Sequence, residues 1–166
     1  MMTTVVTAVS FDANMKTALQ QFIETYFDGG THLIASTLVS FPLASATFNR
    51  PILDRPLQDN VATINFQQLP SPPQEFRGMN LRKKVDYQIL VITNDPSGQF
   101  QDWASDCLAV IFTQCRDVLA TSGIRVETVG APVAWSDPAH EYGVTQRVVR
   151  FLVELPGANR NWNWNG

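Results

Sequence analysis

Near the middle of this chain, the spacing of its apolar residues changes from that of a strand to that of a helix. Residues 81–93 alternate, so that two sets of side chains point to opposite faces of a strand. The turn residues Asn-Asp-Pro-Ser-Gly follow at 94–98. After them apolar residues recur about every 3.6 positions, the period of an amphipathic helix. This order predicts a domain that mixes strands and helices. One strand set is Val85, Tyr87, Ile89 and Val91, and the other is Asp86, Gln88, Leu90 and Ile92.

The helix after the turn is predicted over residues 99–119, before Ser122-Gly123. Its broad apolar stripe predicts Trp103 and Phe112 as buried anchors. Cys107 and Cys115 lie on the same stripe. Eight positions along a helix correspond to about 12 Å, too far for a disulfide. We therefore expect two reduced, buried cysteines. The stripe contains Phe100, Trp103, Ala104, Cys107, Leu108, Ile111, Phe112, Cys115, Val118 and Leu119.

Other segments complete the expected fold. A first helix is predicted over 12–27, before Gly29-Gly30, and strands over 61–66, 124–129 and 145–155. Residues 33–41 fit either a strand or a short buried helix, and 132–143 fit a long connection or a hairpin arm. The prediction is an α+β fold. It has an antiparallel sheet of about four strands with two amphipathic helices packed on one face, plus extended loops or arms. Residues 1–156 form one domain in this interpretation, and 157–166 a flexible Asn/Trp tail.

Composition narrows the class of protein. The chain has 166 residues, enough for one domain with its own core. Charged residues make up 16%, against about 25% in a typical globular protein, which suggests that a partner covers part of the surface. The net charge of −3 argues against a basic nucleic-acid binder. No apolar run is long enough to span a membrane, and the start lacks the pattern of a secretory signal. We expect a soluble protein that is not exported.

Chemistry-bearing motifs are missing from the sequence. It contains no GxSxG, P-loop, GxGxxG, HExxH or CxxC pattern. His32 and His140 stand in no spacing that suggests a nucleophile and its base. Asp102, Asp106 and Asp117 fit the solvated side of a helix better than a metal site. We expect no enzyme activity, no catalytic residue, no cofactor and no metal.

Two groups of residues are candidates for interaction. The basic cluster Arg77, Arg82, Lys83 and Lys84 either protects an edge strand from aggregation or contacts an acidic protein surface or DNA phosphates. Aromatic residues form the second group: Trp135 and Tyr142 in the 132–143 segment, and Trp162 and Trp164 in the tail. The tail tryptophans either fold back on the domain, dock on a partner or belong to a disordered end.

The order of these elements resembles a known family. A helix, a strand, a Pro-rich loop, a basic run into a long strand, a turn, an amphipathic helix and a terminal hairpin resemble the tail terminator (tail completion) proteins of long-tailed bacteriophages. The resemblance rests on an order of elements and not on an invariant signature. The matching segments are Met15–Tyr26, Val61–Phe66, Arg82–Thr93, Gln99–Leu119, Ile124–Val129 and Thr145–Leu155.

The resemblance implies a small subunit that assembles into a homo-hexameric ring at the end of the tail tube. Such a ring stops tube growth and joins the tail to the head connector or neck proteins. Its partners are other copies of itself, the tail tube protein and the connector, while DNA passes through the lumen without specific binding. The implied location is the tail or neck of the virion, after synthesis in the host cytoplasm, with no membrane contact.

Two other classes of protein stay open. Residues 31–60 form a longer segment than this family leads us to expect, which leaves room for another neck, tail-tube or head–tail joining protein. A non-viral binding module of ferredoxin-like type is the remaining alternative.

Overall fold

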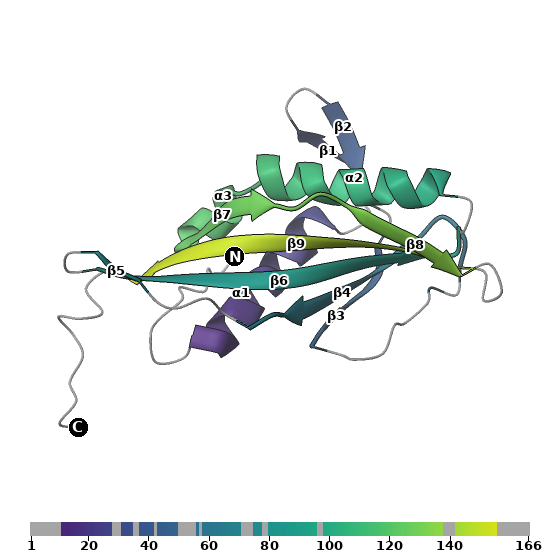
Figure 1. Ribbon diagram of the computed structural model, residues 1–166. Helices are drawn as coiled ribbons and strands as arrows, with labels where there is room; N and C mark the ends of the chain where they lie inside the picture. Colours follow the sequence, from purple (N-terminus) through teal and green to yellow (C-terminus); the bar gives the residue numbers. More distant parts are fainter. Residues whose placement is uncertain are drawn as a thin grey trace.

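The sheet and its helices are seen in a computed structural model, which describes residues 11–27, 31–34, 37–41, 43–49, 56, 58–70, 75–77, 80–95, 98–137 and 142–155 (Figure 1). The helices are α1 (Phe11–Tyr26), α2 (Gln99–Gln114) and α3 (Asp117–Thr121). The strands are β1 (Thr31–Ile34), β2 (Thr37–Ser40), β3 (Leu43–Phe48), β4 (Ala62–Gln68), β5 (Glu75–Arg77), β6 (Asn80–Thr93), β7 (Ile124–Val129), β8 (Val133–Asp137) and β9 (Tyr142–Leu155).

Seven of these strands form one sheet. Its main order is β3-β4-β6-β9-β7, with β5 paired to β6 and β8 paired to β9. The long strands β6 and β9 are antiparallel and form the centre of the sheet. The β1–β2 hairpin is a separate two-stranded sheet that stands away from the large one in Figure 1. The expected α+β class is confirmed. The sheet is larger than the four or so strands that we expected, and β3 and β4 run parallel.

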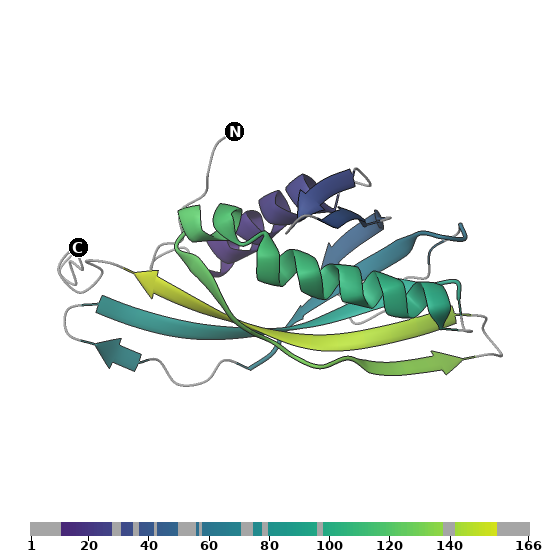
Figure 2. The same ribbon diagram turned by 90° about the horizontal axis from the view of Figure 1, so that it is seen from above.

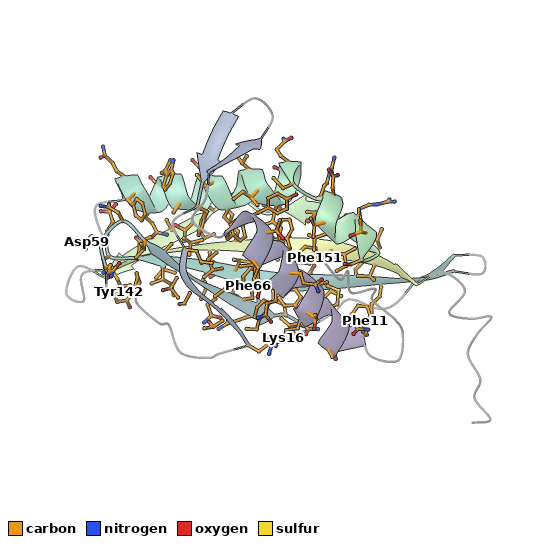
Figure 3. The ribbon with its side chains drawn as sticks, turned by 180° about the vertical axis from the view of Figure 1, so that it is seen from behind. Phe11, Lys16, Asp59, Phe66, Tyr142 and Phe151 are labelled. Atoms are coloured by element: carbon orange, nitrogen blue, oxygen red, sulfur yellow. The ribbon has the colours of Figure 1, made fainter. Side chains whose placement is uncertain are left out.

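The main core lies between one face of the sheet and the helices. Figure 2 shows α1 and α2 on the same side of the long strands. At the centre of this core, Phe112 of α2 contacts four other rings: its ring centroid is 5.1 Å from that of Phe22 and 6.0, 6.5 and 6.0 Å from those of Phe27, Phe66 and Phe151. Figure 3 shows Phe66 and Phe151 beside α1 in the middle of the molecule. Helix α1 therefore joins the core through its apolar stripe, as predicted.

The second predicted helix is interrupted. It ends at Gln114, and α3 begins at Asp117. Cys115, at the end of α2, leaves the helical conformation with φ −105° and ψ 39°. The 3.6-residue pattern continues through this break because Leu119 of α3 still points into the same core. Hydrophobic period alone therefore did not reveal the two helices.

The prediction that Trp103 is a buried anchor of α2 is wrong. Phe112 is completely buried, as predicted, but Trp103 is 44% exposed. The predicted stripe is wider than the surface that α2 packs against the sheet. Trp103 lies on the flank of that stripe, where its ring contacts Phe100 at 5.5 Å. Cys107 and Cys115 are both free and buried, so that prediction is confirmed.

The uncertain segments of the sequence also take a definite form. Residues 31–48 contain β1, β2 and β3, so the strand interpretation of 33–41 holds for the part that the structure describes. The 132–143 segment is a hairpin arm, made by β8 and the start of β9. Residues 157–166, with Trp162 and Trp164, lie outside the described residues, so the predictions for the tail are still untested.

Candidate subunit interface

The predicted basic cluster does not form one patch. Because β6 alternates, Lys83 and Lys84 point to opposite faces of the sheet. Lys83 lies on the helix side, its Nζ 4.0 Å from the ring centroid of Phe11. On the other side, Lys84 Nζ lies 3.6 Å from Glu127 of β7. These contacts occupy both lysines within the subunit.

The two arginines of the cluster lie at one end of the sheet. Arg77 belongs to β5 and pairs in register with Asn80. Arg82 of β6 stands in register between Glu75 of β5 and Glu154 of β9. Because β6 has a paired strand on each side at Arg82, this residue does not lie on a free strand edge.

The face of the sheet opposite the helices carries a line of charge pairs. Arg150 of β9 donates two hydrogen bonds to the carboxylate of Asp86 on β6, at 2.7 and 2.9 Å. The two residues are direct register partners. These hydrogen bonds raise the pKa of Arg150, which favours its charged form. We call this side the open face, because no described helix packs on it (Figure 2).

Farther along the open face, a small apolar cluster replaces the charge pairs. Leu90, Ile92 and Val144 are buried there, and Tyr142 packs against them. Trp135 of β8 is the register partner of Val144. The structure therefore brings two predicted interaction residues, Trp135 and Tyr142, to the same hairpin. The basic cluster lies at the opposite end of the long strands (Figure 1).

A buried hydrogen-bond network fixes the sheet under the start of α2. Gln101 Nε2 donates to the Val91 carbonyl at 2.8 Å and to Thr145 Oγ1 at 2.6 Å. Its Oε1 accepts from Thr93 Oγ1 at 2.5 Å. All three polar side chains are buried. The network ties α2 to β6 and β9 at the end of the sheet where β8 pairs. No local pattern indicates this network, because the period of the α2 segment is defined by its apolar residues and Gln101 is polar.

Arg147 forms a second buried contact near this end. Its guanidinium donates to Ser105 Oγ and to the Gly130 carbonyl at 3.0 Å each, and to Asp106 at 3.2 Å. Burial lowers the pKa of Arg147, while the charge of Asp106 opposes that shift. Because Gly130 lies between β7 and β8, the arginine holds the start of the hairpin arm to α2. Arg147 was not among the residues singled out from the sequence.

The two edges of the sheet differ in chemistry. At one edge, β3 (Leu-Ala-Ser-Ala-Thr-Phe) carries no charged residue. The other edge is shared by β7 and β8, which both pair with β9. β7 carries Arg125 and Glu127 and has an irregular register between Val126 and Thr128. Charges and irregularities of this kind protect an edge from pairing with another strand. β8 carries a single charge, Asp137 at its end, and its Val133 is 61% exposed.

Each edge also has a surface hollow. One, of about 610 Å³, lies between α1 and β3, where Lys16 and Glu24 of α1 stand opposite Ala46 and Thr47 of β3. The other, of about 540 Å³, lies between α3 and β7 and includes Arg116 and Arg125. No group of three or more His, Cys, Asp or Glu side chains able to hold a metal is found among the described residues.

Comparison with protein-family models and with curated proteins finds no match to this chain. Among the helices that the structure describes, none has the length and apolar character needed to cross a membrane. The features that bear on function are therefore those of the sheet itself: one face covered by helices, one open face, and two edges of different chemistry.

Proposed function

We propose that this chain is a structural virion protein, a tail terminator of a long-tailed bacteriophage. Identical subunits form a six-fold ring at the end of the tail tube, stop its growth and join it to the head connector. The protein acts by binding and has no catalytic role. It works in the tail or neck of the particle after synthesis in the host cytoplasm.

The observation that carries this proposal is the presence of two chemically different edges on opposite sides of one sheet. A ring of identical subunits uses a heterologous interface, in which one surface of each copy meets a different surface of the next. The uncharged β3 edge and the β7–β8 edge supply two such surfaces. Their order across the sheet places them as far apart as the sheet allows.

Two further features support the same proposal. The low charged fraction of 16% fits a subunit whose sides are covered by its neighbours. The hairpins β5–β6 and β8–β9 lie at opposite ends of the long strands (Figure 1). In a ring with its axis along these strands, one hairpin faces the tail tube and the other faces the connector. Each end of the ring then presents a different surface to a different partner.

Disruption of the gene in the phage that carries it tests this function. We expect over-long tails without heads in electron micrographs, and recovery of normal particles when the intact gene is supplied. Tails of normal length without heads would favour the head–tail joining alternative. Normal, joined particles would contradict a role at the tail end altogether.

A further inference from the structure

We propose that neighbouring copies of this chain join edge to edge, with β8 of one copy adding as an antiparallel strand to β3 of the next. This inference rests on the ring proposed above and names the segments that close it. Adding a strand to an exposed edge is a common way for proteins to bind, because the backbone groups of both strands find partners. Among the described strands, β3 pairs only with β4 and β8 only with β9.

The register of the sheet puts β3 and β8 at the same level along the strands. Each step across the sheet goes from one residue to its register partner on the next strand. The row that begins at Ser45 passes through Thr63, Ile92 and Val144 and ends at Trp135. The neighbouring row runs from Ala46 through Ile64, Val91 and Thr145 to Ala134. The two edges therefore meet without a shift along the strands when a second copy is placed beside the first.

β7 does not share this level. Its last paired residue, Val129, is the register partner of Val149, which pairs with Tyr87 and so with Gln68 at the end of β4. β3 reaches only as far as Phe48, opposite Phe66. β7 would therefore meet β3 only if the second copy slid along the strands. Its charged residues and irregular register also make it the poorer partner.

The strand directions fit as well. β3 is parallel to β4, and each of the next three pairings, β4–β6, β6–β9 and β9–β8, is antiparallel. β8 thus runs opposite to β3 within one copy. Rotation about an axis along the strands leaves every strand direction unchanged, so β8 also runs opposite to β3 of the neighbour. Antiparallel pairing is the more stable of the two kinds per residue.

The side chains at the two edges are compatible with this contact. β3 has six residues and no charge, and β8 has five residues with a single acid, Asp137, at its far end. Val133 of β8, 61% exposed, lies in the row of Thr47, whose side-chain oxygen is buried and has no hydrogen-bond partner in the described part of the chain. A neighbouring strand covers Val133 and brings backbone groups to the free edge of β3.

Cross-linking between two variants, each with one added cysteine, tests the pairing. Purified Ser45→Cys chains that carry a size tag are mixed with untagged Trp135→Cys chains and oxidised. In a separate experiment, sedimentation velocity measures the association of the chains. Ser45 is exposed, and the native cysteines are buried. The matched control replaces Trp135→Cys by Thr128→Cys, an exposed position on β7. We expect a mixed covalent dimer in roughly tenfold excess over the control, because disulfides require Cα atoms within about 7 Å.

A second variant tests the edge without a disulfide. Ser45→Lys places a charge on the β3 edge and is expected to weaken association at least tenfold, whereas Thr113→Lys, at an exposed site on α2, leaves it unchanged. If the chains associate but cross-link equally in both mixtures, the strand pairing is overturned. It is also overturned if Ser45→Lys leaves association unchanged. Neither result contradicts the proposal of a ring. Absence of association at the highest soluble concentration would also overturn the strand pairing, and the gene-disruption experiment would still decide the function.

Discussion

The two faces of the sheet are built from the same strands but make different kinds of contact. On the helix side, Phe112 and its ring neighbours form a closed aromatic core. On the open face, the Arg150–Asp86 pair is a contact between partly exposed side chains. Buried aromatic area contributes far more to stability than exposed ion pairs do. Folding therefore depends on the helix side, while the open face and the edges can meet a neighbour without unfolding.

The largest effect on stability is expected from truncation of the aromatic core on the helix side. Phe112→Ala is expected to lower the free energy of unfolding by about 3–5 kcal/mol, because it leaves a cavity among four rings. Trp103→Ala is the matched control on the same helix, and its 44% exposure predicts a much smaller loss. Urea denaturation of both variants measures the difference. Equal losses would mean that α2 packs through a different face.

The polar end of the helix side offers a second test. Gln101→Ala removes the three side-chain hydrogen bonds of Gln101 and leaves buried polar groups on β6 and β9 without partners. We expect a loss of about 2–3 kcal/mol in the free energy of unfolding. Gln99→Ala, at an exposed position two residues earlier, is the control. A Gln101→Ala variant as stable as the control would show that the network does not hold α2 to the sheet.

Alkaline pH probes the buried thiols of the helix side. Burial, with a smaller effect of Asp106, raises the pKa of Cys107 from 9.0 to about 11. A raised pKa means that the folded state favours the neutral thiol, so its contribution is complete below pH 9 and declines as pH rises toward 11. At pH 11 the loss is roughly 2 kcal/mol. Cys107→Ala removes this contribution, and unfolding curves at pH 7 and pH 11 measure it. Identical pH dependence in the two proteins would contradict the burial of this thiol.

The smallest effect is expected on the open face. Asp86→Asn removes the charge that faces Arg150 and should lower the stability only slightly, far less than Phe112→Ala, because the pair is partly exposed. The loss should shrink further in 1 M salt, where exposed charges are screened. Thermal denaturation at low and high salt measures both effects. A loss as large as that of Phe112→Ala would remove the distinction between the two faces.

Local patterns in the sequence predicted the continuous elements well. The first helix was expected over 12–27 and lies at Phe11–Tyr26, and the strand expected over 81–93 lies at Asn80–Thr93. In both segments a strong period, fixed by neighbouring residues, determines the structure. The strand expected over 124–129 has the predicted bounds. Elements of this kind need no information about distant parts of the chain.

The features that the sequence did not reveal depend on distant partners. β3 forms only because β4 lies parallel beside it, and β8 only because β9 returns along it. The exposure of Trp103 depends on how much of α2 the sheet can cover. The candidate interface was visible only in part: Trp135 and Tyr142 were singled out and do share a hairpin, but the match in level between β3 and β8 emerges from four successive strand pairings.

The most direct test of the ring is a mass measurement on the assembled protein. Native mass spectrometry and negative-stain electron microscopy of the purified chain, alone and with tail tubes, give the number of copies and their symmetry. A heterologous interface that closes gives a ring of identical subunits, and the resemblance to tail terminators implies six of them. A two-fold dimer as the end state, in which the same surface of both copies meets, would contradict the account.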